Sequence, residues 1–289
     1  MPHKRQSASK RRSVPRGRRR PAGSRRTSSL TTRQRWLRIA RTLPLSLHLL
    51  FASAIVAGFW YASNGVYQAL RKPSELFFPV ADALHKTPTE TWRAYGRLFE
   101  RHSTASIEPG LLAALAQVEG SGNPLVRTYW RWSWSAQPYA IYRPASSAVG
   151  MYQITDGTFT EARRYCIRDH VAVEVGPWHD WDACWFNALY LRTLPSHAVE
   201  MTSAYLDVKL NRILERHRIR SATSSQKRDL AAVIHLCGAG AGARFAGRNF
   251  EITPGQRCGD HDLRKYLENV RRTQAIFERL AAGTDHSKN

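Results

Sequence analysis

The longest uninterrupted apolar stretch of the chain runs from Thr42 to Leu70 and contains no Asp, Glu, Lys or Arg. A helix of about 20 apolar residues is long enough to cross the hydrocarbon core of a bilayer. We therefore predict a transmembrane anchor over residues 42–70. A buried core helix and the apolar part of a cleaved signal peptide are the alternative interpretations of such a stretch.

After the anchor, apolar residues recur mainly at helical spacing. Residues 71–104 predict a linker and an amphipathic helix around TETWRAYGRLFERH. The next helix is expected to begin near Pro109 and to end at Gly120. A further helix is expected to begin in TDGTFTEARRYC, with an Asp or Thr as its cap. Later apolar stripes predict helices at about 181–193, 196–217, 226–237 and 261–282.

Strand patterns are few. Residues 129–142 contain six aromatic side chains, and Trp130, Trp132 and Trp134 alternate with Arg131 and Ser133, which predicts a short hairpin or an ordered loop. The run CGAGAGA is interpreted as a glycine-rich turn, because a dinucleotide-binding loop would need a strand on each side of its helix. The predicted fold class is a mostly α domain over residues 105–283 with a small extended insert, followed by a flexible C-terminus at 284–289.

Charge changes this picture at the N-terminus. The formal net charge is +22, and residues 1–41 contain 15 of the 44 Lys and Arg and no Asp or Glu. Such a segment buries too little apolar surface to fold, so we predict a disordered tail. Its positive charge places the tail in the cytoplasm and everything after about residue 70 on the far side. Arg clusters can bind nucleic acid, but nothing in the tail indicates base recognition, and we favour contact with anionic lipid heads.

The chain has four cysteines, all in the part expected on the far side of the membrane. An even number of cysteines in an oxidising compartment predicts disulfides. Proximity in the sequence favours Cys166 with Cys184 and Cys237 with Cys258, although three pairings are possible. No CxxC or HExxH spacing occurs, so we expect neither a metal site nor a cofactor.

One acidic residue lies where its chemistry would be altered. Glu119 follows Leu115 by four residues and Leu112 by seven, so it shares the inward face of its helix. Burial and the negative end of the helix dipole both raise the pKa of an acid and favour its protonated form, which can donate a proton to a leaving oxygen. The following GSGNP allows a sharp turn that leaves the carboxyl accessible. A half-exposed structural Glu is the alternative.

Three motifs resemble the catalytic core of the Slt-type lytic transglycosylases, relatives of goose-type lysozyme that cleave peptidoglycan. The family's first motif is Glu-Ser with a Pro five residues after the Glu, and here Glu119 and Pro124 keep that spacing. The second motif, Gly-Leu-Met-Gln, reads Gly-Met-Tyr-Gln at residues 150–153 within SSAVGMYQITDGTF. The third, Ala-Tyr-Asn-Ala-Gly, corresponds to AAVIHLCGAGAG, with Gly238 in register. The resemblance covers about residues 105–245.

The chain departs from the family pattern at three places. Gly120 replaces the Ser of the first motif. His235 and Leu236 replace the Tyr and Asn of the third motif, and that Tyr would hydrogen-bond the catalytic Glu. The interval between Glu119 and Gly150 is longer than the family's, and the surplus is the aromatic stretch.

The resemblance implies a lysozyme-like fold and one catalytic acid, Glu119. This acid would protonate the glycosidic oxygen of the MurNAc-GlcNAc β-1,4 bond and then act as base while the sugar's 6-hydroxyl closes a 1,6-anhydro ring. Aromatic side chains in the insert would either stack on sugar rings or pack the loop onto the domain. The candidate substrate-binding residues are Ser147, Gly150, Tyr152, Gln153, His235 and Gly238, together with Tyr129 and Trp130.

Taken together, these features predict a single-pass protein of the bacterial inner membrane with a cytoplasmic N-terminus and a periplasmic catalytic domain. The expected partners are peptidoglycan glycan strands, the membrane itself and a cell-wall or secretion assembly. Two alternatives remain open. One is a muramidase that transfers the sugar to water, and the other is a peptidoglycan-binding module without catalysis.

Overall fold

The structure is a computed structural model that describes residues 42–72, 75–76, 82–177, 179–180 and 183–286. The predicted disordered tail over residues 1–41 and the last part of the predicted flexible C-terminus lie outside the described residues. The chain divides into two compact units, residues 1–58 and 59–289, and each is considered by itself. All of the chemistry discussed below lies in the second unit.

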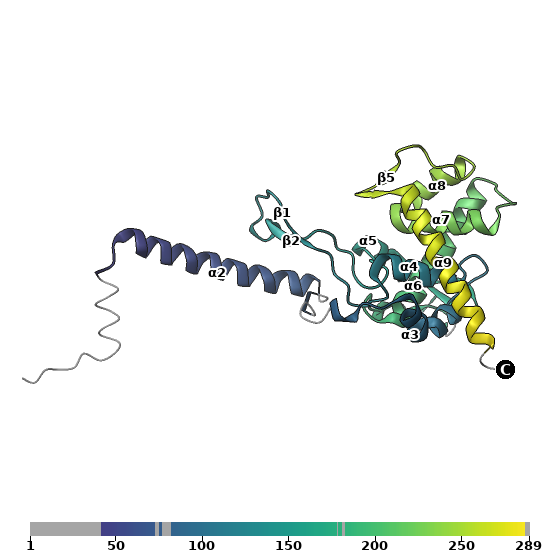
Figure 1. Cartoon of the computed structure of the whole chain (residues 1–289), viewed down its shortest axis with the longest axis horizontal. Helices are drawn as coiled ribbons and strands as arrows, with labels where there is room; N and C mark the ends of the chain where they lie inside the picture. Colours follow the sequence, from purple (N-terminus) through teal and green to yellow (C-terminus); the bar gives the residue numbers. More distant parts are fainter. Residues whose placement is uncertain (1–41, 73–74, 77–81, 178, 181–182, 287–289) are drawn as a thin grey trace, which may run out of the picture. The chain divides into compact units, whose positions relative to one another are not determined.

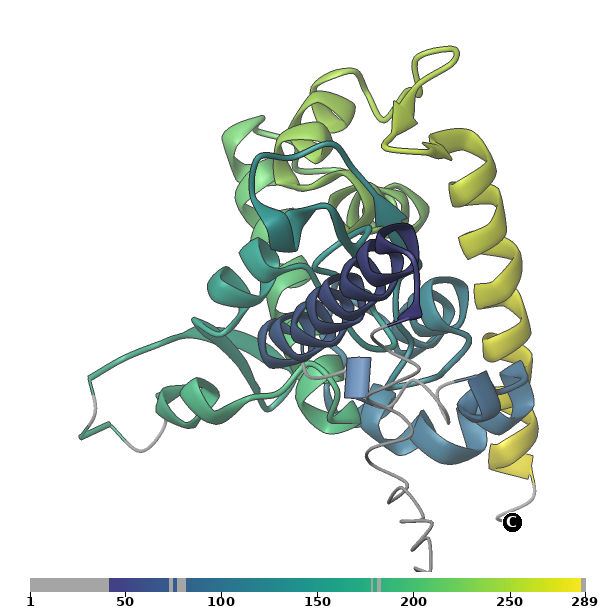
Figure 2. The ribbon, with the colours of Figure 1, turned by 90° about the vertical axis from the view of Figure 1, so that its left-hand side faces the viewer.

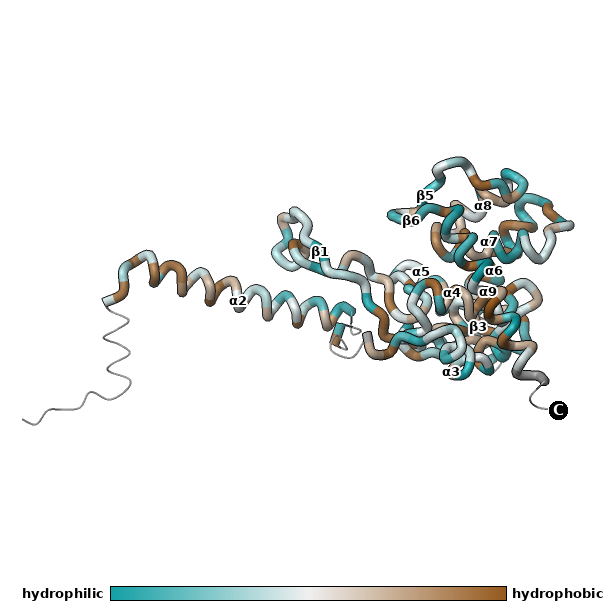
Figure 3. Tube along the Cα trace, in the orientation of Figure 1, coloured by the Kyte–Doolittle hydropathy of each residue, from teal (hydrophilic) through white to brown (hydrophobic). Residues whose placement is uncertain are grey.

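The apolar stretch forms one helix, α2 (Leu45–Arg71), which is long and apolar enough to cross a membrane. Large apolar side chains along it, including Phe51, Ile55 and Phe59, are exposed. This exposure fits a membrane-facing helix and does not fit the alternative of a buried core helix. Figure 3 shows that the helix is more hydrophobic in its first turns and more hydrophilic toward Arg71.

The second unit is built mainly from helices around α4 (Pro109–Gly120). Leu111, Leu112 and Leu115 of α4 are fully buried. α4 packs against α3, α6 and α9, and Figure 2 shows α9 along one side of the domain. The other helices are α3 (Pro88–Arg101), α5 (Asp156–Ala162), α6 (Pro195–Arg216), α7 (Ser224–Cys237), α8 (Ala239–Gly247) and α9 (Leu263–His286), with 3₁₀-helices η2 (Asp82–Leu84), η3 (Pro138–Ala140) and η4 (Trp185–Leu189).

Most of the predicted helices are confirmed, but two expectations were wrong. In the described part of the segment predicted as a helix at 181–193, the structure has only the 3₁₀-helix η4. A disulfide at Cys184 and a hydrogen bond from Asn187 to the Tyr165 carbonyl hold this part against β3. The glycine-rich run after Cys237 is mostly helix α8 and not only a turn. Its glycines allow α8 to pack closely on α7, as Gly242 shows: a Cβ there would lie 2.6 Å from Cγ1 of Ile234.

The strands form three separate antiparallel pairs in the described part of the chain. The predicted hairpin in the aromatic stretch is confirmed as β1 (Trp130–Trp132) paired with β2 (Tyr142–Pro144). The other two pairs had not been predicted. They are β3 (Tyr165–Arg168) with β4 (Val171–Glu174), and β5 (Arg257–Cys258) with β6 (His261–Asp262).

Both disulfides suggested by proximity in the sequence are present. Cys166 in β3 is bonded to Cys184, and Cys237 at the end of α7 is bonded to Cys258 in β5. Each bond therefore fastens a short strand pair, which has little apolar surface of its own, to the helical domain.

The contact between α8 and α7 generates a prediction about stability. Gly242→Ala should reduce the free energy of unfolding by about 1–3 kcal/mol, because the new methyl group overpacks against the buried side chain of Ile234. Gly240→Ala in the same helix is the matched control, since only the end of the Arg244 side chain lies within 4 Å of a Cβ there. Because Ala has a higher helix propensity than Gly, Gly240→Ala should leave the free energy of unfolding unchanged or raise it by up to about 1 kcal/mol. Urea unfolding of the two variants measures the difference, and equal losses in both would contradict the packing argument.

Candidate active site

Glu119 lies in the last turn of α4, and the chain reverses direction immediately after it. Ser121 and Gly122 adopt left-handed conformations with φ of 49° and 63°. The Ser121 amide donates to the carbonyl of Gln117, which ends the helix. This turn leaves the side chain of Glu119 16% exposed. The carboxylate is therefore mostly buried yet within reach of a ligand.

Two side chains from other helices meet the carboxylate. The Tyr266 hydroxyl in α9 donates a hydrogen bond of 2.6 Å to Oε1 of Glu119. Nε2 of His235 in α7 lies 3.8 Å from the same oxygen. The sequence predicted His235 as a substrate-binding residue, at the place where the resemblance implies a Tyr, and the structure places it beside Glu119. Tyr266 was not among the predicted site residues.

The environment keeps both partners uncharged. Burial raises the pKa of the Tyr266 hydroxyl well above its usual value, and the neighbouring Glu119 raises it further, so Tyr266 remains a hydrogen-bond donor. Burial lowers the pKa of His235, and the attraction of Glu119 and a hydrogen bond with the Tyr152 backbone offset only part of this effect. No Lys or Arg of the described residues forms an ion pair with Glu119.

The hydroxyl that donates to Glu119 does not come from the segment that corresponds to the third motif of the resemblance. The resemblance implies a Tyr at the place of His235, and in this chain the phenol comes from α9, outside the region that the resemblance covers. In the sequence, Tyr266 is one member of an apolar helical stripe that includes Leu263 and Leu267. The one feature of the sequence that could have pointed to Tyr266 is that the hydroxyl of a buried Tyr usually needs a hydrogen-bond partner.

The motif around Gly150 forms a tight turn over the end of α4. Gly150 has φ of 78°, and a Cβ there would lie 2.4 Å from the Arg192 carbonyl oxygen. A Cβ on Gly120 would lie 2.8 Å from Cα of Met151, so no side chain fits at that position. A Ser at this position, which the resemblance implies, would therefore clash with the backbone at Met151.

Arg192 holds the same turn from outside and was not predicted. Its guanidinium donates to the carbonyl oxygens of Ser147 and Ile154, at 2.9 and 2.8 Å, and pairs with Asp156 at 2.8 Å. The Ser147 hydroxyl accepts from the Asp156 amide at 3.2 Å. Ser147 therefore has a local role at the start of α5, and Asp156 is occupied by its ion pair.

Two further predicted ligand residues use their polar groups inside the protein. The Tyr152 ring is fully buried, and its hydroxyl donates to the Leu112 carbonyl at 3.1 Å. The Gln153 amide donates to the Gly150 carbonyl at 2.9 Å. Tyr152 packs its edge against His235, with ring centroids 6.3 Å apart. These residues support the turn and the His235 ring.

His235 lines a small cavity of about 210 Å³ whose lining is mixed polar and apolar. Gln153 and Gly238, both predicted to bind substrate, line it. Thr202 of α6 also lines it, and the structure shows no hydrogen-bond partner for its buried hydroxyl among the described residues. An unsatisfied buried hydroxyl is unfavourable, and a hydroxyl or acetamido group of a ligand would satisfy it. The remaining lining residues include Thr155, Thr158 and Tyr205.

Tyr129 and Trp130 do not meet Glu119. They line a larger cavity, of about 820 Å³, together with residues of the second half of α2 such as Tyr61 and Leu70. The Trp130 indole donates to Glu75 at 2.8 Å. We call Glu119, His235 and Tyr266 the Glu119 cluster. None of these three residues lines the larger cavity, so its size alone does not make it the candidate active site.

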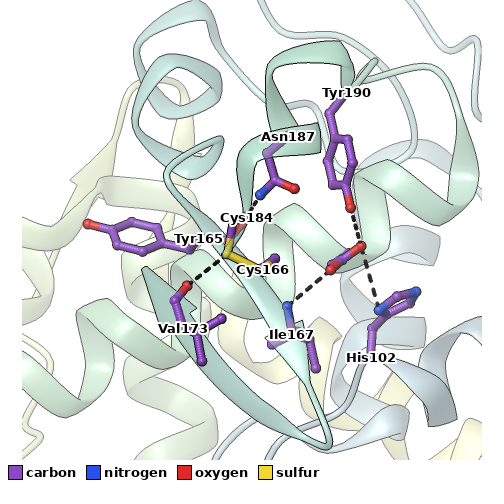
Figure 4. The surroundings of a disulfide bond; sticks show 9 residues. His102, Tyr165, Cys166, Ile167, Val173, Cys184, Asn187 and Tyr190 are labelled. Atoms are coloured by element: carbon purple, nitrogen blue, oxygen red, sulfur yellow. Dashed lines mark hydrogen bonds and ion pairs between the residues drawn. A yellow bond between two sulfur atoms is a disulfide. The ribbon is translucent and has the colours of Figure 1, made fainter. Parts of the chain in front are cut away.

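Other buried or nearby acids are occupied by internal partners. The Glu200 carboxylate accepts from the Ile167 amide at 3.0 Å and from the Tyr190 hydroxyl at 2.7 Å, with His102 3.9 Å away (Figure 4). Burial and this hydrogen bond raise the pKa of Tyr190. Glu161 forms an ion pair with Lys209. Among the described residues, no group of three or more His, Cys, Asp or Glu side chains is arranged to hold a metal ion.

Comparison with known proteins does not add to these observations. No family model matches the chain, and no curated protein matches it.

The buried histidines predict how stability depends on pH. Burial lowers the pKa of His102 and of His235 in the folded state below the unfolded value of about 6.5. Below that pH the unfolded chain binds protons that the folded chain does not, so the free energy of unfolding should fall as the pH falls from 7 to 5, by up to about 1.4 kcal/mol per pH unit for each histidine. The stabilisation is fully present above the unfolded pKa.

Urea unfolding at several pH values measures this slope. His235→Gln should make it shallower by the contribution of one histidine, whereas His85→Gln, which replaces an exposed histidine, should leave it unchanged. If the free energy of unfolding had the same pH slope in both variants, the pKa of His235 would not be lower in the folded chain than in the unfolded chain, which would contradict the prediction.

Proposed function

We propose that the protein is a membrane-anchored lytic transglycosylase that cleaves the MurNAc-GlcNAc β-1,4 bond of peptidoglycan, with Glu119 as its one catalytic acid and base. The observation that carries this proposal is the environment of Glu119. Its carboxylate is mostly buried, contacts the neutral side chains of Tyr266 and His235, and has no cationic partner in the described part of the chain. Such an environment is typical of catalytic acids.

The proposed reaction needs two proton transfers through the same carboxyl. Glu119 in its acid form donates its proton to the glycosidic oxygen while the bond from that oxygen to C1 of MurNAc breaks, which releases the 4-hydroxyl of GlcNAc. The Glu119 carboxylate then accepts the proton of the MurNAc 6-hydroxyl as O6 bonds to C1. The product carries a 1,6-anhydro ring, Glu119 regains its proton, and no water is consumed.

The surrounding residues have positioning roles in this scheme. The Tyr266 hydroxyl donates to one carboxylate oxygen and fixes its orientation, which leaves the other oxygen, Oε2, for the substrate. Neutral His235 packs beside the pair and forms one wall of the small cavity. The Thr202 hydroxyl in that cavity, which has no hydrogen-bond partner in the described ranges, would bind a polar substituent of the sugar.

Two other functions remain as alternatives. A hydrolysing muramidase usually needs a second carboxylate on the other side of the bond, and Asp156, Glu161 and Glu200 are each occupied by internal partners. A peptidoglycan-binding module without turnover is the other alternative, and Tyr152 and Gln153 do not support it specifically, because their polar groups donate to backbone carbonyls. Product analysis separates the three functions.

The proposed location follows from the anchor and the disulfides. Helix α2 would hold the protein in the bacterial inner membrane, with residues 1–41 in the cytoplasm near anionic lipid heads and the catalytic domain in the periplasm. Two disulfides fit an oxidising compartment. Glycan strands, and a cell-wall or secretion assembly that they surround, are the partners expected there. No cofactor and no nucleic acid enters the proposal.

Glu119→Gln tests the catalytic role. The variant keeps the shape of the side chain but cannot donate or accept the transferred proton, so it should release soluble fragments from purified peptidoglycan at least about 100-fold more slowly. Mass spectrometry of the products identifies 1,6-anhydro ends from the natural chain. Reducing ends would establish the muramidase instead. A natural chain that binds the wall but releases nothing would establish the binding module.

Tyr266→Phe tests the positioning role of the phenol. Loss of the hydroxyl removes the group that orients the Glu119 carboxylate, so kcat should fall by about tenfold with little change in KM. Tyr190→Phe is the matched control, because it removes a similar Tyr-Glu hydrogen bond at Glu200. It should cost about 1 kcal/mol of stability and leave kcat unchanged. Equal kcat values in both variants would assign Tyr266 a structural role only.

A further inference from the structure

The β1–β2 hairpin packs along the second half of α2. We call residues 127–144 the aromatic hairpin. The side-chain amide of Asn64 donates to the Tyr142 carbonyl at 2.7 Å, and that of Gln68 donates to the Tyr139 carbonyl at 2.6 Å. Both amide side chains are buried by this contact, with 1% and 6% of each residue exposed. The hairpin is therefore fastened to α2 through its backbone.

Aromatic pairs continue this contact along the helix. Trp60 stacks with Trp132, Tyr61 with Tyr142 and Tyr67 with Tyr139, at centroid separations of 6.2, 6.2 and 4.9 Å. Each pair joins one ring from α2 with one from the hairpin. The hairpin is thus aligned with the helix over the stretch from Trp60 to Gln68.

The remaining surface of the aromatic hairpin is exposed and basic. Trp134 is fully exposed, and Trp132 and Tyr129 are each 67% exposed. Arg131 and Arg143 are exposed as well. The hairpin contains three Arg and no Asp or Glu. Large aromatic side chains in water are unfavourable, and their combination with Arg matches the boundary of a membrane, where rings enter the headgroup layer and guanidinium groups bind phosphates.

The position of the aromatic hairpin along α2 also places it near the boundary of the membrane. Trp60 is 15 residues after Leu45, the first residue of α2. At 1.5 Å per residue this is roughly 22 Å along the helix, within the roughly 30 Å of a hydrocarbon core. The helix becomes polar from Ser63 and Asn64 onward. The stretch that holds the hairpin therefore spans the predicted boundary between hydrocarbon and headgroups.

We propose that the aromatic hairpin is a second membrane contact, in which Trp132 and Trp134 insert into the headgroup layer of the periplasmic leaflet while Arg131 and Arg143 bind lipid phosphates. The proposal rests on the anchor of the proposed function and is independent of catalysis. It accounts for the surplus residues between Glu119 and Gly150, because the aromatic hairpin is inserted between these two parts of the candidate site. The enzyme would then be confined to the peptidoglycan nearest the membrane.

A fluorescent label at residue 134 tests the contact in the full chain. All four cysteines are in disulfides, so Trp134→Cys gives one thiol for an environment-sensitive dye. In vesicles of phosphatidylethanolamine and phosphatidylglycerol, the emission should shift to the blue. Lipids with a nitroxide near the headgroup should quench it at least about twofold more than lipids with a nitroxide at the chain end. Ser221→Cys, at an exposed position in the same unit, is the control and should report water.

A second variant keeps the result interpretable if the dye itself enters the bilayer. Adding Arg131→Glu and Arg143→Glu to the labelled chain should restore quenching by aqueous iodide, because the basic groups would no longer hold the hairpin on anionic lipid. Unchanged protection in that variant would overturn the proposal.

Three further outcomes contradict the lipid contact. In the first, the dye at residue 134 has the emission and the quenching of the dye at residue 221, which would show that it is in water. In the second, the dye is protected from iodide, is not quenched by lipid nitroxides and loses its protection when the protein is diluted in lipid, which would show that a second copy of the chain covers the hairpin. Finally, the chain could fail to float with the vesicles, which would refute the anchor on which the proposal rests. Release of soluble peptidoglycan fragments by the same preparations reports separately on catalysis, so the two failures are distinguishable.

Discussion

The hydrogen bond from Tyr266 to Glu119 joins residues 147 positions apart, and the packing of α4 against α9 makes it possible. The buried leucines of α4 fix the rotation of that helix and so direct Glu119 toward α7 and α9. Burial keeps Tyr266 a donor and His235 neutral, so the carboxylate is held by groups that add no charge. The proposed chemistry depends on this arrangement, because the Tyr266 hydrogen bond orients the carboxyl that would transfer the proton.

Two glycines allow the chain to pass close to the end of α4. A Cβ on Gly120 would lie 2.8 Å from Cα of Met151, and a Cβ on Gly150 would lie 2.4 Å from the Arg192 carbonyl oxygen, so the turn contacts the end of α4 and the backbone of Arg192 directly. Arg192 closes the turn from outside through two backbone carbonyls and Asp156. The aromatic hairpin, between the same two motifs, is fastened to α2 and contributes nothing to the Glu119 cluster. The aromatic hairpin and the residues around Glu119 therefore belong to separate parts of the domain.

The sequence predicted what periodicity and proximity determine. Helical stripes located α3, α4, α6, α7 and α9, alternation located the first hairpin, and neighbouring cysteines formed the disulfides. The β3–β4 hairpin was missed because its turn places Asp169 and His170 at φ of 45° and 61°, where Asn-Gly or Asp-Gly would be the usual signal. Tyr266 was missed because the spacing of apolar residues shows which side of a helix is buried but does not show which distant group the hydroxyl of a buried Tyr bonds. A hydrogen bond between residues far apart in the sequence has no signature in that spacing.

A crystal structure of the Glu119→Gln chain with a peptidoglycan fragment bound tests the central claim most directly. The account predicts that the glycosidic oxygen lies within hydrogen-bond distance of residue 119, on the side away from Tyr266, and that a polar substituent of the sugar reaches Thr202 in the small cavity. A fragment bound in the larger cavity beside α2, with residue 119 out of its reach, would contradict the assignment of Glu119 as the catalytic group.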